Sequence, residues 1–167
     1  AGLLILAAGV NLLSAGVALA TLASYVVVYT PLKSRTSFAT VIGAIPGALP
    51  PVIGWAAARN GLSQGAWVLF GIVFLWQLPH FLAIAWIYRE DYARANFQLL
   101  PVVEPEGTST GRQIVVHSLA LLAVGLLPTT LHLAGAVYFV TAFVLGVAML
   151  VCGVMLARSY SHVAAGR

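Results

Sequence analysis

The stretch WQLPHFLAIAWIYREDYARANFQLLPV, residues 76–102, begins as a long apolar run and ends in a cluster of charges. Arg89, Glu90, Asp91 and Arg94 fall within six positions, and Glu90 and Asp91 are two of the four acidic residues in the chain. A long apolar run with a charged end is typical of a membrane helix that emerges into water. The stretch therefore predicts a membrane helix whose chemistry lies at its rim.

The composition of the whole chain supports the same class. Of 167 residues, 61% are hydrophobic and 7% are charged, whereas soluble domains carry about 25% charged residues. A soluble protein of this size could not bury so much apolar surface, so we predict an all-α polytopic transmembrane bundle, with residues 1–167 as a single membrane domain. The lone Cys152 cannot form an internal disulfide, and its apolar surroundings predict a buried thiol.

Apolar runs predict the helices of this bundle. The third is interrupted by Pro46, Pro50 and Pro51, and the fifth is short enough that its start could reach back towards Gly111. The first lacks a basic flank and begins at Ala1, so we interpret it as the cut end of a membrane helix in a longer protein. The predicted helices cover roughly residues 1–9, 15–29, 38–58, 65–88, 112–127 and 133–157.

Charges distinguish the two ends of the predicted helices. If the loops alternate between two sides, residues 10–14, 59–64 and 128–132 share one side, where Arg59 is the one charge. The other side holds 30–37, 89–113 and the tail after 157, with all four acids, Glu90, Asp91, Glu104 and Glu106, and seven basic residues, Lys33, Arg35, Arg89, Arg94, Arg112, Arg158 and Arg167. The positive-inside rule places this second side in the cytoplasm, and basic residues between apolar segments do not indicate a nucleic-acid surface.

A stripe of residues connects the interior of the fourth helix to its charged rim. Trp76, His80, Ala83, Ile87 and Asp91 recur at helical spacing. At 1.5 Å per residue, Asp91 would lie about 16 Å along the axis from His80. The rim carboxylates have two interpretations. They form a solvated helix end with a surface ion pair worth under about 1 kcal/mol, or they hold a divalent metal ion.

His80 also has two interpretations. Ionisable residues within membrane helices are rare and usually face the bundle interior. His80, which follows Pro79, is then either an interior hydrogen-bond partner, which we favour, or a contact to a cofactor iron or a substrate. Gln77, three residues earlier, would be its neighbour or a second polar contact. His117 and His132 have no companions at metal-ligand spacing and stay unassigned.

Two further stretches allow both structural and functional interpretations. In YVVVYTPLKSRTS, residues 25–37, Tyr29 and Pro31 end a helix just before Lys33 and Arg35. The two cations either anchor the helix at the membrane surface or hold an anionic head group above an apolar cavity. In GAIPGALPPVIGW, residues 43–55, prolines and glycines predict either a structural kink or a cavity wall.

Carboxylates, basic residues and an apolar cavity together predict a reaction on a prenyl diphosphate. Carboxylates can hold Mg²⁺ shared with substrate phosphates, Lys and Arg can take the remaining phosphate charge, and an apolar cavity would accept the lipid tail. A secondary transporter is the first alternative, but only one segment here is broken by Pro and Gly. A haem-binding electron-transfer subunit is the second. Such a subunit needs two axial ligands to the haem iron. His80 and His117 are the one plausible pair, and His117 is too close to a helix end.

The same stretches carry a family resemblance. YTPLKSRT, GAIPGALPPVIGW and WQLPHFLAIAWIYREDYARANFQLLPV, in this order, closely resemble the protohaem IX farnesyltransferases (haem O synthases), a branch of the UbiA-type intramembrane prenyltransferases. The resemblance runs from about Tyr25 to Val102. It implies transfer of the farnesyl group of farnesyl diphosphate to a vinyl group of haem B, giving haem O; the alternative is another UbiA-type prenyltransferase. The family's first acidic motif and last helix are missing, so we do not expect these residues to be active alone.

The resemblance also implies roles for particular residues. Within YREDYARA, Glu90 and Asp91 correspond to catalytic Mg²⁺ ligands. Diphosphate or propionate binding falls to Lys33, Arg35, Arg89 and Arg94. Further substrate contacts are expected from Tyr29, Tyr88, Tyr92, His80 and Gln77, and Trp76 is a candidate ring for the cavity lining, since ring faces attract cations.

The expected partners also follow from the resemblance. They are haem B, farnesyl diphosphate and the lipid bilayer, with haem A synthase or terminal-oxidase assembly factors as protein partners and no nucleic acid. The compact loops favour a bacterial plasma (inner) membrane over a mitochondrial inner membrane.

Overall fold

A computed structural model describes the backbone of residues 1–165 and the side chains of residues 1–160. The described residues form helices and no strands. Five segments are long and apolar enough to cross a membrane: Leu12–Leu32, Ala39–Arg59, Gln64–Ile87, Thr108–Thr130 and Ala136–Tyr160. This confirms the predicted all-α polytopic class.

The elements are α1 (Gly2–Gly9), α2 (Leu12–Ala23), the π-helical η1 (Ser24–Tyr29), α3 (Thr30–Leu32), α4 (Ala39–Ala48), α5 (Pro50–Arg59), α6 (Gln64–Ile87), α7 (Arg89–Arg94), α8 (Leu100–Val103), α9 (Thr108–Thr130) and α10 (Ala136–Ala165).

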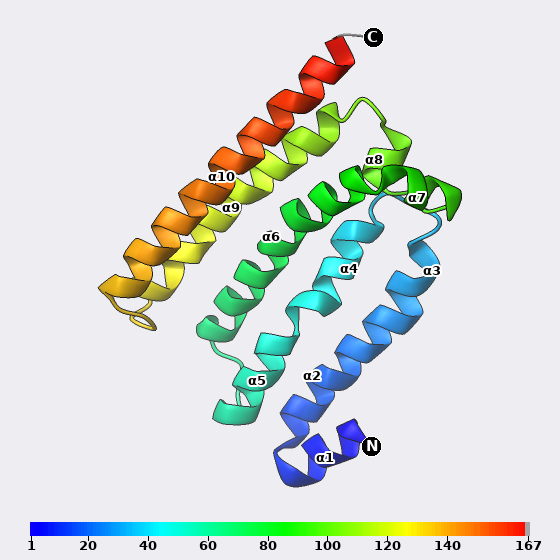
Figure 1. Cartoon of the computed structure of the whole chain (residues 1–167). Coiled ribbons are helices and arrows are strands. Elements are labelled where there is room, and N and C mark those ends of the chain that lie inside the picture. Colours follow the sequence, from blue (N-terminus) through cyan, green and yellow to red (C-terminus); the bar gives the residue numbers. More distant parts are fainter. Residues whose placement is uncertain (166–167) are drawn as a thin grey trace.

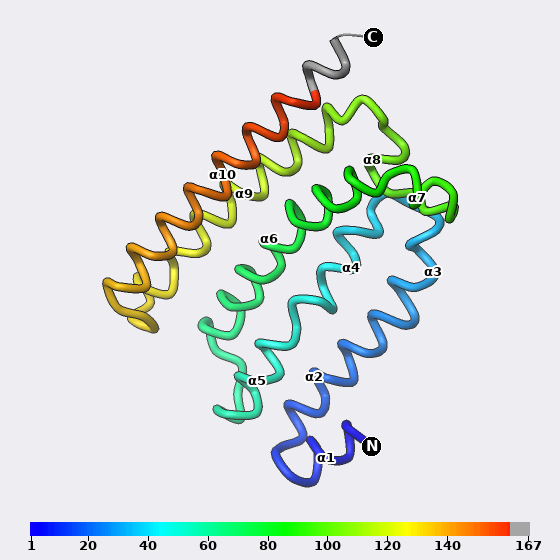
Figure 2. Tube along the Cα trace, in the orientation of Figure 1, coloured from blue at the N-terminus to red at the C-terminus, as the bar shows by residue number. Residues whose placement is uncertain are grey.

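The spanning segments stand in one row in chain order, and each packs against the next (Figure 1). Successive segments run in opposite directions, so the chain passes back and forth along the row (Figure 2). Small residues allow the closest approach: Gly111 lies against Ala157, and Gly153 lies against Ile114 and Ser118, where α9 meets α10. A single row leaves much of the apolar surface of α2 and α10 uncovered by this chain.

The loops separate into two groups, as the charge pattern predicted. Helices α3, α7 and α8 lie at one end of the row, together with the start of α9 and the end of α10 (Figure 1). The turns at 10–11, 60–63 and 131–135 lie at the other end. Asn11 ties that end together, because its Nδ2 donates to the Ala56 carbonyl at 2.9 Å while its Oδ1 accepts from the Ser14 amide at 2.8 Å. Arg167, one of the seven basic residues, lies outside the described residues.

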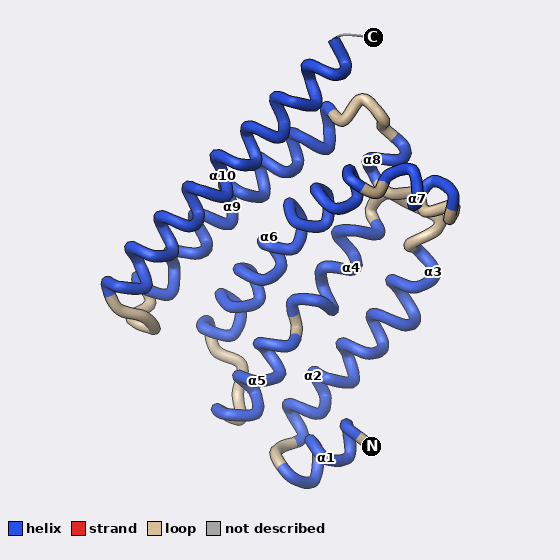
Figure 3. The backbone as a smooth tube through the Cα atoms, viewed as in Figure 1, coloured by secondary structure: helices blue, strands red, loops and turns tan. Residues whose placement is uncertain are grey.

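The proline-rich segment breaks at Leu49, between α4 and α5 (Figure 3). Pro50 and Pro51 lack the amide hydrogens that would continue the ladder of α4, whereas proline is readily accommodated in the first turn of a new helix. Pro46 lies inside α4 and is buried. This spanning segment therefore consists of two short helices, α4 and α5. The glycines of α4 face the neighbouring elements.

The structure departs from several expected boundaries. Helix α6 ends at Ile87, and Tyr88 has φ −101° and ψ 22°, so the charged residues after it form a separate helix, α7. Asp91 is therefore not on the helix that carries His80, and the expected continuous stripe, with its 16 Å axial spacing, is wrong. Helix α2 begins at Leu12 rather than 15, and α9 covers 108–130 rather than 112–127. Cys152 is exposed rather than buried, because α10 has a neighbour in this chain on one side only.

Candidate active site

A cavity of about 610 Å³ lies between the first three spanning segments and opens towards α7. Most of its wall is apolar or aromatic, and Lys33 is the one charged residue that lines it among the described residues. The lining residues are Thr21, Leu22, Tyr25, Tyr29, Lys33, Thr40, Gly43, Pro46, Gly47, Gln77, Phe81, Ile84, Ala85, Tyr92, Phe97 and Leu99. The proline-rich segment thus contributes a cavity wall as well as a kink.

Two glycines on one face of α4 let neighbouring side chains approach its backbone. A Cβ atom at Gly43 would lie 2.6 Å from a ring carbon of Tyr29, and one at Gly47 would overlap the side-chain oxygen of Gln77. The glycines are four residues apart and so lie one above the other on the helix. At these two glycines the backbone of α4 has no side chains of its own, and the Tyr29 ring from η1 and the Gln77 amide from α6 pack directly against it.

Gln77 is the most constrained polar group of the wall. Its side chain is buried, and its Nε2 donates to the carbonyl of Ala44 on α4 at 3.3 Å and to that of Val73 on its own helix at 3.1 Å. Gln77 lines the cavity, and its predicted polar contact to a substrate stays a prediction. Its partners are backbone carbonyls, however, and not the expected neighbour His80.

Aromatic rings surround the charged mouth of the cavity. The Lys33 ammonium lies 5.7 Å from the centre of the Phe97 ring, within the range of a cation–π contact. Phe97 meets Tyr92 edge-on at 5.8 Å, and Tyr25 and Tyr29 are 5.2 Å apart. These residues come from η1, the turn after α3, α7 and the segment after α7, so only the folded chain brings them together.

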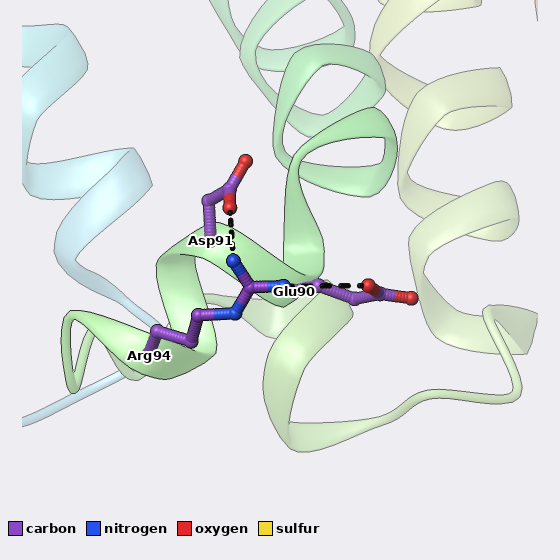
Figure 4. Close-up of polar contacts among 3 residues, drawn as sticks. All are labelled: Glu90, Asp91 and Arg94. Atoms are coloured by element: carbon purple, nitrogen blue, oxygen red, sulfur yellow. Dashed lines mark hydrogen bonds and ion pairs between the residues drawn. The ribbon is translucent and has the colours of Figure 1, made fainter.

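The acidic residues of α7 flank one arginine. Nη1 of Arg94 lies 3.3 Å from Oδ1 of Asp91, and Nη2 of Arg94 lies 4.0 Å from Oε2 of Glu90. All three side chains are exposed. The two carboxylates contact different nitrogens of the guanidinium, Asp91 at Nη1 and Glu90 at Nη2 (Figure 4). The surface ion pair that was one interpretation of this sequence is present, and the closer of its two acidic partners is Asp91. None of the three residues is in the wall of the cavity.

Several predicted site residues point elsewhere. Arg89 folds back onto the end of α6, where its Nη1 donates to the Trp86 carbonyl at 3.2 Å and its guanidinium covers the Trp86 ring at 4.7 Å. Trp86 in turn stacks on Tyr160 at 4.0 Å. Arg35 and Tyr88 are exposed and do not line the cavity. In this structure the predicted cationic cluster is reduced to Lys33 at the cavity itself.

His80 does not occupy the interior position that we expected, and that prediction is wrong for the described residues. Its side chain is exposed and stacks on Trp76 at 4.8 Å, and its ring is tilted against that of Phe81 at 5.7 Å. Phe81, the next residue, is turned by about 100° around the helix and lines the cavity in its place. Trp76 is likewise outside the lining.

Apolar members of the wall, chiefly Phe81, Phe97 and Leu99, were not predicted from the sequence. Their chemistry does not distinguish them from the many other apolar residues of the chain. Gly43 and Gly47 could have been found, because a pair of glycines at a spacing of four often marks a close helix contact in membranes.

The UbiA prenyltransferase family model matches residues 1–167. The chain is similar to proteins named protoheme IX farnesyltransferase. It is 57% identical to that of Solibacter usitatus over 94% of this chain and 54% of the relative. It is 52% identical to that of Koribacter versatilis over 81% and 44%, and 47% identical to that of Myxococcus xanthus over 89% and 50%. The chain thus spans about half the length of the curated relatives it matches. No solved structure matches it.

Proposed function

Because the chain belongs to the UbiA prenyltransferase family, we propose that it forms part of an enzyme that transfers the farnesyl group of farnesyl diphosphate to a vinyl group of haem B, making haem O. Relatives named protoheme IX farnesyltransferase support this substrate pair. The observation that carries the proposal is the cavity, whose apolar, aromatic wall opens beside the Lys33 ammonium and the acidic helix α7. Such a cavity suits a prenyl tail with an anionic head.

Each part of the cavity has a role in this reaction. Lys33 binds the diphosphate and stabilises the negative charge that grows on it as the bond to the farnesyl carbon breaks. The faces of Tyr29 and Tyr92 stabilise the positive charge that develops on the allylic carbon. The terminal carbon of the vinyl group then bonds to that carbon. Water adds to the remaining cation and loses a proton to solvent, which creates the hydroxyethyl group of haem O.

Mg²⁺ is the cofactor that we propose. Mg²⁺ binds through one or two carboxylates together with substrate phosphates and water. Asp91 and Glu90 are oxygen donors on α7, and both contact the Arg94 guanidinium, at different nitrogens (Figure 4). No group of three metal-ligating side chains occurs among the residues that the structure describes. As neighbouring carboxylates on α7, Asp91 and Glu90 fit the chemistry of a site in which each would supply one ligand, with the others drawn from diphosphate and water. When bound, Mg²⁺ would neutralise charge on the departing diphosphate.

The charge asymmetry supports a proposal for the orientation of the chain in its membrane. Five spanning segments make the chain multi-pass, and the basic end, with α3 and α7, would face the cytoplasm. The relatives named above come from bacteria, which favours a bacterial plasma membrane. For an enzyme that makes haem O, haem A synthase or terminal-oxidase assembly factors are the protein partners that we expect.

The test is to supply the purified full-length protein with haem B and farnesyl diphosphate and to identify the products by mass spectrometry. Lys33→Met should raise the KM for farnesyl diphosphate by roughly 10- to 100-fold, since bonds to a charged group contribute about 1.5–3 kcal/mol. Arg59→Met, at the opposite end of the row, is the matched control and should leave this KM unchanged. The absence of any farnesylated haem would refute the proposal.

A further inference from the structure

The side-chain amide of Gln77 has an orientation that its neighbours determine. Its Nε2 donates to two backbone carbonyls, those of Ala44 and Val73, which uses both amide hydrogens. Reversing the amide would place its oxygen against two carbonyl oxygens, an arrangement without a hydrogen bond. The Oε1 atom therefore points away from both carbonyls and lies over Gly47, in the space that a Cβ atom there would fill.

The Oε1 atom of Gln77 is a free acceptor on the cavity wall. No described residue donates a hydrogen bond to it. Some fully buried polar atoms of the described residues also have no partner, but Oε1 of Gln77 is not one of them, so a small molecule in the cavity can reach it. Gln77 lines the cavity, and only 6% of the residue is exposed. A buried acceptor favours a hydrogen-bond donor, and the smallest donor that can enter the cavity is water.

We propose that Gln77 holds the water molecule that becomes the hydroxyl group of the product, an inference that rests on the proposed function. Transfer of farnesyl to the terminal vinyl carbon breaks the bond between the farnesyl carbon and diphosphate, forms a carbon–carbon bond and leaves a cation on the vinyl carbon next to the porphyrin. The water oxygen bonds to that carbon, and its extra proton leaves to diphosphate or solvent water. Gln77 accepts a hydrogen bond from the water and so aims its lone pair; the neutral amide takes no proton. Gln77 is thus a positioning residue.

The same cation can also react in a second way, and the ratio of the two products can be measured. Without a held water, the cation loses a proton from the adjacent carbon and yields a farnesylated alkene that is lighter than haem O by one water. The ratio of the two products reports on the water alone. A purely structural bridge between α4 and α6 would change the total turnover or the stability of the protein, and it would leave the ratio unchanged.

The experiment uses the full-length protein with haem B, farnesyl diphosphate and ¹⁸O-labelled water, and measures both products by mass spectrometry. Gln77→Leu removes the acceptor and should raise the alkene share up to about tenfold, the factor that one hydrogen bond contributes. Gln77→Glu keeps acceptor oxygens but loses the bonds to Ala44 and Val73, and it should still make mainly the labelled hydroxyl product. Gln113→Leu, on α9 away from the cavity, is the matched control and should retain the wild-type ratio.

The outcomes separate the inference from the function on which it rests. A wild-type product ratio in Gln77→Leu overturns the water role, whatever happens to the total turnover. If Gln77→Leu does not fold, Gly47→Ala displaces the amide oxygen without changing residue 77. It should also raise the alkene share, and an unchanged ratio there overturns the inference equally. Failure of the wild-type protein to make any farnesylated haem refutes the proposed function instead, and the inference with it.

Discussion

Gly107 offers a sharp test of how the acidic helix is held in place. It precedes the first residue of α9, has φ +77° and is buried. A Cβ atom there would lie 2.5 Å from two ring carbons of Trp86 and 3.2 Å from Cβ of Tyr160. The Trp86 ring cannot easily retreat, because Tyr160 stacks on it at 4.0 Å and the Arg89 guanidinium covers it at 4.7 Å. Trp86 is the penultimate residue of α6, and α7 begins at Arg89.

The magnitude of the effect follows from two costs. A left-handed backbone costs a residue with a Cβ atom about 1–2 kcal/mol, and overpacking a filled site costs about 1–3 kcal/mol. Gly107→Ala should therefore lower the free energy of unfolding by roughly 2–5 kcal/mol. Gly107→Asn tolerates the positive φ better but keeps the clash, so it should recover only the backbone part of the loss.

The assay is unfolding of the full-length protein in detergent, followed by tryptophan fluorescence. Gly125→Ala is the matched control on the same helix, because a Cβ atom at Gly125 meets nothing within 4 Å. This control should be neutral or stabilising by up to about 1 kcal/mol, since alanine is the better helix former. If Gly107→Ala proved as stable as Gly125→Ala, the contact that we assign between α6, α9 and α10 would be refuted.

Three further predictions concern topology, the metal and the exposed histidine. Cysteines at Ser34 and Ser109 should react with a membrane-impermeant reagent from one side and a cysteine at Ser63 from the other; labelling of Ser34 and Ser109 from opposite sides would contradict the helix count. Asp91→Asn should strongly reduce turnover in the full-length protein, with partial recovery in excess Mg²⁺, and near-normal haem O formation would exclude the metal role. His80→Ala should change the thermal stability of the protein by less than about 0.5 kcal/mol, as for most exposed positions, so a larger loss or a shifted Soret band of bound haem would show that His80 has a partner beyond this chain.

The sequence alone determined the class of the protein and the ends of its helices. Apolar windows of about 20 residues identify spanning segments without reference to neighbours, and the basic residues between them assigned the loops at 30–37 and 89–113 to one end, where the structure places them. Pro50 and Pro51 likewise predicted a break in the third segment, because a missing amide hydrogen is a local property of the residue.

Only the tertiary structure decided which side chains face the cavity. Helices that are apolar all round carry no amphipathic signal, so the sequence does not show which face is turned inwards. The rotation of α6 placed Gln77 and Phe81 in the wall and left His80 outside it. The bend at Tyr88 separated Asp91 from the axis of α6, and packing against Trp86 turned Arg89 away from Lys33. Each of these outcomes depends on contacts between segments far apart in the chain, and no local pattern of residues records such contacts.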